Sequence, residues 1–479
     1  MCRLMTILLA VALLGGLALA QVEIGAQKQL FIDEQLIDKS ENITLTVNQP
    51  RKDAQPVMVG QGEELNWALY NQILEDGGVY KMWYQARRGG NMWIGYATSK
   101  DGLTWDKPNL GLVEIEGSKD NNIVFPFKSA APFQIEGGCV FIDSNPACPP
   151  QEKYKMIVRW RPSEAEHHGT WVLVSADGIH FKPIADKPSF RDSDTGNVGF
   201  WDERIGKYVI YVRMWLPGIL APRVVCRCET GDLRDFGKEE IVIQRDRLDP
   251  KDVEFYTNAA IKYEGVYLAF PSMLHTPENF KELDAKKINY GRMDVQLATS
   301  RDGVKWNRPD RRPFVSLGLA GAWDSEIIYL YTGLIEKPDE LWFYYWGRNY
   351  THHVSNRQVN GPMTCHVNRL VLRRDRFISA DAPFAGGRLT TKPLRFEGSK
   401  LVLNIETSVA GEARVELLDQ AGAPIPSFTL ADCDPIKDNN VRKVVSWKGN
   451  ADLSKLAGQP MRIRFDARDA KWYAFQFVK

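Results

Sequence analysis

The sequence predicts an all-β protein, a five-bladed β-propeller followed by a C-terminal β-sandwich, because one strand pattern recurs five times. The copies of this aromatic-rich strand begin at Tyr80, Tyr154, Tyr208, Tyr267 and Trp342. Each interval between copies has room for four short strands and their loops, which is the content of one propeller blade. Short β-rich runs bounded by Gly, Pro and Asp dominate this region, whereas long helical periodicity is almost absent from it.

A second repeated pattern supports the same division. Three segments have the form Ser-x-Asp-Gly-x-x-aromatic, at 99–105, 175–181 and 300–306. Asp-Gly between two β-rich runs is typical of a hairpin turn, because Gly adopts positive φ without strain and Asp tolerates it. We therefore interpret these aspartates as turn residues rather than as catalysts.

The innermost strand of each unit precedes the recurring strand. The predicted inner strands are 66–74, 136–142, 197–201, 253–261 and 325–333. Residues 30–37 and 370–378 are expected to close the ring. After residue 387, short alternating runs separated by turns favour a β-sandwich. The expected domains are therefore the propeller at 21–383 and the sandwich at 388–479.

The N-terminus predicts a secretory signal peptide over residues 1–20. Arg3 provides a positive charge, residues 4–14 form an apolar run, and Ala-Leu-Ala at 18–20 fits a cleavage site. The apolar run is shorter than the about 20 residues that a membrane span needs, so a membrane anchor is the less favoured alternative. We expect a secreted or periplasmic protein.

Composition narrows the class of partner. The chain has 61 Lys and Arg against 60 Asp and Glu, which leaves no overall field to attract nucleic acid. Its 14 Trp and 17 Tyr provide flat rings that suit the apolar faces of sugars.

Export permits a disulfide between Cys139 and Cys148, and buried free thiols are the equally favoured alternative. Nothing in the sequence indicates an oligomeric state.

Carboxylates stand at the start of every predicted inner strand, from where they would face one central funnel. They are Glu63 and Glu64, Glu136, Asp192 and Asp194, Asp252 and Glu254, and Asp324 and Glu326. Polar groups at the start of a core strand are costly unless they are paired or used in function. Two interpretations are open, a functional cluster or a rim in which neighbouring arginines pair with the acids.

Clustered carboxylates are the groups that glycoside hydrolysis needs. One carboxyl, kept protonated by its neighbours, protonates the leaving oxygen, while another activates water or attacks the anomeric carbon. The expected substrate contacts are Asp252, Asp324, Glu326, Glu136, Tyr256, Trp67, Trp323, Arg87 and His352. This chemistry requires no cofactor, and a Ca²⁺ ion held by the carboxylates is an alternative use of the cluster.

In these features the chain resembles the five-bladed propeller glycoside hydrolases of the invertase/levanase and arabinanase/xylosidase families. The resemblance extends over the export signal, the five units, the Ser-x-Asp-Gly hairpins and the C-terminal sandwich. Those families take a nucleophile or base, an aspartate stabiliser and a glutamate acid from three inner strands, which by position implies Glu64, Asp194 and Glu254. Their Asn-Asp-Pro-Asn-Gly, Arg-Asp-Pro and Glu-Cys signatures are not present.

Glu254 is the expected general acid. Alternation along a strand places Asp252, Glu254 and Tyr256 on one face, and a nearby Asp252 makes a proton on Glu254 easier to keep. Asp194 would help to set the pKa of Glu254. In the alternative interpretation, Asp252 caps the strand and Glu254 pairs with an arginine such as Arg213.

Two other functions are open. The hairpins are similar to the boxes of sialidases but one residue shorter, and the tyrosine nucleophile of those enzymes would correspond to Tyr256. A propeller that binds sugar without cleaving it predicts stacking tryptophans without a working acid pair. The sequence does not indicate the sugar, the linkage or the stereochemical outcome.

Overall fold

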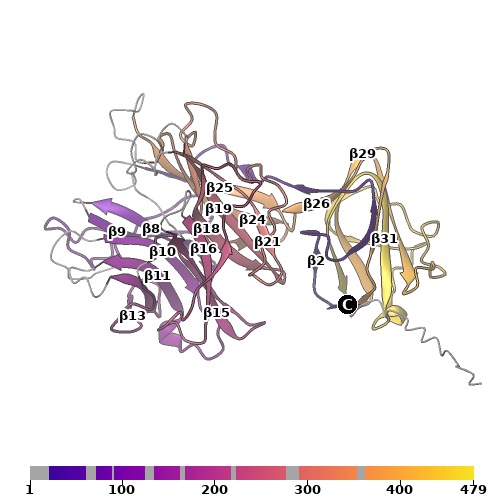
Figure 1. Cartoon of the computed structure of the whole chain (residues 1–479), viewed down its shortest axis with the longest axis horizontal. Coiled ribbons are helices and arrows are strands. Elements are labelled where there is room, and N and C mark those ends of the chain that lie inside the picture. The colour runs from indigo at the N-terminus through magenta and orange to yellow at the C-terminus, as the bar shows by residue number, and fades with distance from the viewer. Residues whose placement is uncertain are drawn as a thin grey trace, which may run out of the picture.

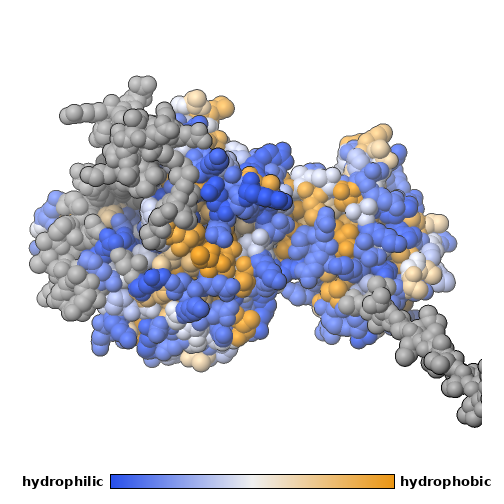
Figure 2. Space-filling view, in the orientation of Figure 1, coloured by the Kyte–Doolittle hydropathy of each residue, from blue (hydrophilic) through white to orange (hydrophobic). Residues whose placement is uncertain are grey.

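The computed structural model describes residues 21–60, 72–88, 91–124, 134–161, 168–191, 193–216, 223–276, 291–352 and 362–479. Regular structure in these ranges is β-strand, apart from two short 3₁₀ turns at Pro150–Glu152 and Ser454–Leu456. The chain forms two lobes joined by a narrow waist near β26 (Figure 1). Hydrophilic residues predominate on the face shown in Figure 2, with apolar residues gathered in the middle of the larger lobe. No helix in the described ranges could cross a membrane.

The larger lobe contains five groups of antiparallel strands that follow one another along the chain. The first is β7 (Gln72–Asp76), β8 (Val79–Arg88) and β9 (Asn91–Ser99); the second is β10 (Gln134–Ile142), β11 (Tyr154–Arg161), β12 (Gly169–Ser175) and β13 (Lys182–Pro183). The third is β14 (Val198–Asp202), β15 (Lys207–Trp215), β16 (Arg223–Thr230) and β17 (Glu240–Ile243).

The fourth and fifth groups share one larger sheet, because β20 pairs with β22 in parallel. The fourth is β18 (Val253–Tyr263), β19 (Val266–His275), β20 (Arg292–Val295) and β21 (Ala298–Ser300). The fifth is β22 (Ile327–Leu330), β23 (Ile335–Glu336), β24 (Glu340–Arg348) and β25 (Cys365–Arg373), with β5 (Arg51–Lys52) and β6 (Met58–Val59) along its edge.

The hydrophobic core of this lobe lies between neighbouring groups. Its clusters join Trp83 to Tyr154, Ile157 to Ile210, Tyr211 to Phe255, Phe270 to Phe343, and Tyr80 to Tyr344. The last of these clusters connects the first group with the fifth, as does the contact of the Tyr80 and Trp342 rings at 6.1 Å. The packing therefore runs from each group to the next and returns from the fifth group to the first.

The three Asp-Gly hairpins are structural, as the sequence predicts. Each Asp carboxylate accepts hydrogen bonds at 2.8–2.9 Å from the backbone N–H groups two and three residues further on. Each Gly has positive φ, and its carbonyl accepts a hydrogen bond from an aromatic side chain of the preceding group. These donors are Tyr344 to Gly102 at 2.8 Å, Trp83 to Gly178 at 2.7 Å, and Tyr211 to Gly303 at 2.9 Å. The hairpins thus fasten neighbouring groups together.

Four inner-strand predictions are confirmed within a few residues, by β10, β14, β18 and β22. Of the first inner strand only β7 lies in the described residues. The prediction that residues 30–37 close the ring is wrong. Instead β5 and β6 pair with β25, placing Lys52 opposite Leu370 and Met58 opposite Val367.

The smaller lobe is one ten-stranded sheet made from both ends of the chain. Its N-terminal strands are β1 (Val22–Gly25), β2 (Gln29–Leu30), β3 (Ile37–Glu41) and β4 (Thr44–Val47). The others are β26 (Ile378–Ala382), β27 (Gly387–Thr391), β28 (Leu394–Phe396), β29 (Lys400–Asp419), β30 (Asn439–Val444) and β31 (Met461–Val478).

Strand pairing therefore differs from the expected boundary at residue 383. Residues 22–47, which the sequence assigned to the propeller, pair with strands of the C-terminal region. The Phe31 ring lies 5.8 Å from those of both Phe465 and Phe475, so its burial stabilises this arrangement. Alternation identifies a strand but not its partner, which is why the sequence did not reveal that residues 22–47 pair with the C-terminal strands.

Candidate functional site

Asp194 and Glu254, two of the predicted catalytic carboxylates, both lie beside the Arg223 guanidinium. Asp194 precedes β14, and Glu254 is the second residue of β18. Arg223, at the start of β16, donates from Nη1 to Oε2 of Glu254 at 2.6 Å. Its Nε lies 4.0 Å from Oδ2 of Asp194. The fold thus brings together carboxylates from the starts of two neighbouring inner strands.

Asp194 is surrounded by hydrogen-bond donors. Nη2 of Arg213 lies 2.5 Å from Oδ1, the Trp215 indole donates to Oδ2 at 2.5 Å, and the Thr195 N–H donates to Oδ1 at 2.8 Å. Burial raises the pKa of Asp194. The charge and hydrogen bond of Arg213 and the hydrogen bond of Trp215 together lower this pKa by more than burial raises it. The net pKa lies well below its ordinary range. Asp194 is therefore an anion at neutral pH.

Glu254 is almost completely buried, with 1% of its surface exposed, and its described partner is a cation. The alternative interpretation, in which Glu254 pairs with an arginine, matches this geometry, although the arginine is Arg223 rather than Arg213. The Arg223 guanidinium therefore gives Glu254 a charge-assisted hydrogen bond.

Tyr256 and His352, both predicted substrate contacts, join the same cluster. The register of β18 shifts at Tyr256, between Phe255 and Thr257. The Tyr256 ring contacts the guanidinium groups of Arg213 at 4.4 Å and Arg223 at 4.9 Å, and its hydroxyl lies 2.6 Å from Nε2 of His352. Despite this shift, Glu254 and Tyr256 both contact Arg223, as their expected placement on one face would allow.

We name these residues the funnel cluster: Asp194, Arg213, Trp215, Arg223, Glu254, Tyr256 and His352. Trp215 is 38% exposed, and the Arg223 guanidinium lies 4.1 Å from its ring. Sequence reasoning overlooked Arg223 and Trp215. One signal could have identified Arg223: like Arg213 on β15, it stands in a strongly apolar strand, β16, where a charge requires an acidic partner.

Two other acids at strand starts, Glu136 and Glu326, also pair with basic residues. Glu136 pairs with Arg159, across β10 and β11. Glu326 pairs with Arg292 at 3.0 Å, next to Gly291, whose carbonyl accepts the His352 N–H. Glu326 therefore lies beside the funnel cluster. The half-buried Asp252 accepts a backbone hydrogen bond from Thr276 through its carbonyl.

Asp324 and Trp323 belong to the packing of the fifth group. Asp324 accepts hydrogen bonds from Lys52 at 2.6 Å and from the Tyr345 hydroxyl at 3.0 Å. The Trp323 ring stacks on Tyr345 at 5.6 Å and contacts His366 at 5.3 Å. These partners lie on β5, β24 and β25, and none of them belongs to the funnel cluster.

Three of the predicted site residues cannot be placed from their side chains. Glu64 and Trp67 lie outside the described residues, as do Glu63 and Asp192. Arg87 lies on β8, but its side chain is outside the described part of the structure.

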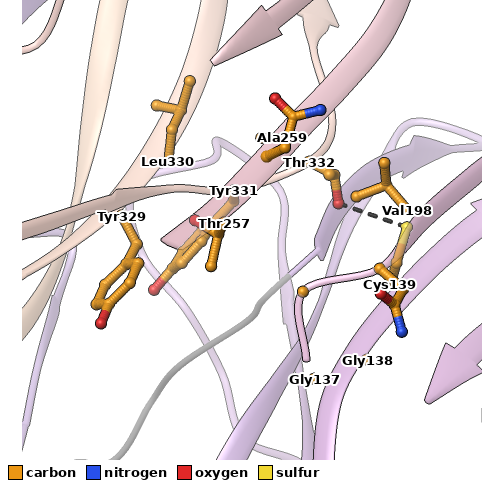
Figure 3. A pocket seen from close by; sticks show the side chains of 13 residues that line it. Gly137, Gly138, Cys139, Val198, Thr257, Ala259, Tyr329, Leu330, Tyr331 and Thr332 are labelled. Atoms are coloured by element: carbon orange, nitrogen blue, oxygen red, sulfur yellow. Dashed lines mark hydrogen bonds between the residues drawn. The ribbon is translucent and has the colours of Figure 1, made fainter. Parts of the chain in front are cut away.

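A small pocket of about 30 Å³ lies against the funnel cluster, lined by four inner strands and the segments beside them (Figure 3). Among its lining residues are Gly137, Cys139, Asn197, Val198, Thr257, Asn258, Tyr329 and Thr332. The Arg213 N–H donates to Oδ1 of Asn197 at 3.0 Å, and the Tyr329 ring lies 5.6 Å from that of Tyr256.

Cys139 is a free thiol, as is Cys148, so the disulfide alternative is wrong. Burial raises the pKa of the Cys139 thiol.

The described residues do not fit a Ca²⁺ site. No group of three or more His, Cys, Asp or Glu side chains gathers there as a metal would require. Ca²⁺ needs several carboxylate or carbonyl oxygens, whereas the carboxylates of the funnel cluster are engaged by Arg213 and Arg223.

Comparison with known proteins gives structural similarities only, because no family model and no curated protein matches the chain. An N-acetylgalactosamine deacetylase from F. plautii is 11% identical, with a TM-score of 0.48, over 70% of this chain and 97% of that one. A fructofuranosidase from Schwanniomyces occidentalis is 11% identical, with a TM-score of 0.42, over 88% and 96%. A thermostable family-43 glycoside hydrolase is 17% identical, with a TM-score of 0.42, over 65% and 91%.

Proposed function

We propose that the chain is a secreted glycosidase whose active site is the funnel cluster, at the mouth of a five-bladed β-propeller. The architecture is supported by five strand groups whose core clusters return from the fifth group to the first. The observation that carries the function is that Asp194 and Glu254 flank one guanidinium beside the partly exposed Trp215. Two carboxylates close to an aromatic face are the groups that cleavage of a glycosidic bond requires.

The two carboxylates have different roles in this proposal. Asp194 is held ionised by Arg213. It either stabilises positive charge at the anomeric carbon, attacks that carbon as the nucleophile, or activates water as the base. Glu254 gives its proton to the leaving oxygen and recovers one from the water that completes hydrolysis. Because Arg223 holds Glu254 in the free protein, substrate binding must draw Arg223 away, so that Glu254 can take up a proton from solvent and then pass it to the leaving oxygen.

Trp215 provides the exposed aromatic surface of the site. Trp215 has an exposed fraction of 38% and is fixed through its indole N–H to Asp194. A sugar ring stacked on Trp215 would therefore lie next to the ionised carboxylate. This arrangement couples binding of the apolar sugar face to placement of the reacting carbon.

A second candidate function, sugar binding without cleavage, has its own supporting observation. Glu254 is paired with Arg223, Glu136 with Arg159 and Glu326 with Arg292. Acids that are already neutralised by cations stabilise the funnel mouth without providing a proton donor. This candidate predicts sugar affinity without turnover.

The test is a hydrolysis screen of the mature protein against plant and algal glycans, with released reducing ends as the measurement. The matched variants are Asp194→Asn and Glu254→Gln, and Asp324→Asn is the control because its partners Lys52 and Tyr345 are not part of the funnel cluster. The glycosidase proposal expects turnover that the first two variants lose and the control retains. A glycan that binds but stays intact over long incubation would establish the second candidate instead. Equal turnover in Asp194→Asn and the unmodified protein would refute this active site.

A further inference from the structure

The smaller lobe has a cleft of about 800 Å³ that the proposed mechanism does not use. This volume lies within the range of small-molecule sites, about 300–1,000 Å³. The lining residues come from β3, β4, β26, β29 and β31 and from the loops after β3 and β26, and none of them belongs to the funnel cluster. We name it the lobe cleft, and its polar lining includes Thr44, Thr46, Asp381, Glu406, Asp469 and Lys471.

A row of polar side chains crosses the floor of the lobe cleft. Strand register aligns Thr44 on β4 with Asp381 on β26. Asp381 is aligned in turn with Lys471 on β31, and Lys471 with Glu406 on β29. Because neighbouring strands lie about 4.8 Å apart, the row extends over about 14 Å. The other face of these strands carries the hydrophobic core, including the fully buried Trp472, so the sheet supports this row from behind.

Two threonine hydroxyls of the lobe cleft are available to a ligand. Thr44 and Thr46 are two residues apart on β4, so both side chains lie on the face that lines the cleft. Neither hydroxyl is engaged by another group in the described part of the chain. A hydroxyl can both donate and accept a hydrogen bond, which suits a ligand that itself presents hydroxyls.

The charges of the lobe cleft favour a neutral ligand. Its lining has three acids, Asp381, Glu406 and Asp469, and one cation, Lys471. An anionic ligand would therefore be repelled. A cationic ligand would compete with existing pairs, because Asp381 pairs with Lys471 at 3.3 Å and Glu406 with Arg376 at 2.5 Å. A neutral ligand avoids both costs, and the paired carboxylates keep lone pairs that accept hydrogen bonds from its hydroxyls.

Exposed apolar side chains stand at one end of the lobe cleft. The Asp469 N–H donates to the Pro383 carbonyl at 3.0 Å, and the Ser408 hydroxyl donates to the Asp469 carboxylate, so two segments meet there. Phe384 in the first segment is 66% exposed, and Val409 in the second is fully exposed. An exposed aromatic ring beside polar groups suits a ligand with both an apolar face and hydroxyls.

We propose that the lobe cleft is a second carbohydrate-binding site, which holds an uncharged stretch of glycan chain along the polar row. The sugar hydroxyls bond to the threonines and carboxylates of the row, Lys471 donates to sugar oxygens, and Phe384 contacts the apolar face of a ring. A chain held on the smaller lobe stays at a high effective concentration near the larger lobe. This site goes beyond the proposed function and does not require hydrolysis.

The experiment measures binding of the full mature protein to soluble polysaccharides by affinity electrophoresis. Five probes are neutral, namely a mixed-linkage β-glucan, an arabinoxylan, an arabinan, a galactomannan and a fructan. Two are anionic, namely polygalacturonate and a sulfated galactan. Retardation as a function of polysaccharide concentration gives the dissociation constant. Melting temperature reports folding, and turnover of short aryl glycosides reports the funnel cluster separately.

The variants remove cleft groups while leaving the sheet intact. The double variant Thr44→Val with Thr46→Val deletes both hydroxyls at little change in volume, and Phe384→Ala deletes the exposed ring. Thr407→Val is the matched control for the threonines, because Thr407 lies on β29 but does not line the cleft. Ile205→Ala is the control for the ring, because Ile205 is 43% exposed in the turn between β14 and β15.

We expect at least one neutral polysaccharide to bind, and to bind more tightly than either anionic one. The double threonine variant should weaken that binding about tenfold, and Phe384→Ala about three- to tenfold. Both should melt within about 2 °C of the unmodified protein, since the substituted side chains are not buried. Thr407→Val and Ile205→Ala should bind as the unmodified protein does. Phe384→Ala provides the test if the double variant does not fold.

Three results would overturn the inference. They are that none of the five neutral polysaccharides binds, that an anionic one binds more tightly, and that the cleft variants bind as the unmodified protein does. The last result would assign any binding to the funnel cluster. Aryl glycoside turnover that persists in such a case would leave the proposed function standing without this inference. Binding that depends on the cleft, without any turnover, would leave the inference standing without the glycosidase.

Discussion

Arg223 donates a hydrogen bond of 2.6 Å to Glu254, and both side chains are almost completely buried. The same guanidinium lies 4.0 Å from Asp194 and 4.1 Å from the Trp215 ring. One residue therefore connects both predicted catalytic carboxylates with the most exposed aromatic ring of the cluster. Any function of this site must involve either keeping or breaking the pair of Arg223 and Glu254.

Glu254→Gln is expected to separate acid catalysis from structural pairing. The variant keeps the shape of the side chain but cannot donate the proton, so turnover should fall about 10²–10⁴-fold on substrates with natural leaving groups. Activated aryl glycosides need little protonation and should lose much less. Initial rates on both substrate types provide the measurement. Equal losses on the two would assign Glu254 to structure or nucleophilic attack, and unchanged rates would remove it from the mechanism.

Asp194 should contribute stability that depends on pH. Its pKa is lowered by Arg213 and Trp215, so its stabilising effect is fully present above the unfolded value of about 3.9 and is lost as the pH falls further. The difference in melting temperature between the unmodified protein and Asp194→Asn should be largest near neutral pH and shrink below about pH 4. A difference that stays constant down to pH 2 would contradict this.

Asp324→Asn should affect stability rather than activity. Asp324 is buried against Lys52 and Tyr345, so loss of its charge should lower the free energy of unfolding by about 1–3 kcal/mol. Because Lys52 and Tyr345 are not part of the funnel cluster, kcat/KM should remain close to that of the unmodified protein. Denaturant unfolding and steady-state kinetics measure the two effects. A large loss of activity at unchanged stability would return Asp324 to the active site.

The C-terminal region is not expected to fold by itself. A fragment of residues 387–479 lacks β1, β2, β3 and β26, which pair with its strands, and β4, which pairs with β26, so it should show no cooperative thermal transition. The Asn48 N–H donates to the Phe377 carbonyl at 2.9 Å, so a short linker can join residues 21–49 to residues 376–479. That linked fragment should unfold cooperatively. Cooperative unfolding of the shorter fragment would show that the N-terminal strands are dispensable.

The N-terminal sequence predicts export and a mature chain that begins at Gln21. The charged residue, apolar run and Ala-Leu-Ala motif specify cleavage after Ala20. Intact-mass measurement of the protein recovered outside the cytoplasm checks the new terminus. Protein that retains Met1 would contradict this prediction.

The sequence alone determined the recurring strands, the turns between them and the inner strands of four groups. These features depend on short-range properties, namely alternation, aromatic content and the ability of Gly to adopt positive φ at Asp-Gly turns. The same reasoning identified Asp194 and Glu254 as neighbours, because the starts of inner strands converge on one funnel.

Tertiary structure decided the partners. Arg223 on β16 donates a hydrogen bond to Glu254 on β18. The strands that pair with β25 are β5 and β6 rather than residues 30–37, and Phe31 packs in the smaller lobe. It also separated Asp324, which binds Lys52, from Asp194 and Glu254. Each of these choices depends on contacts between residues far apart in the chain, where burial and charge pairing determine the outcome and local sequence patterns carry no information about it.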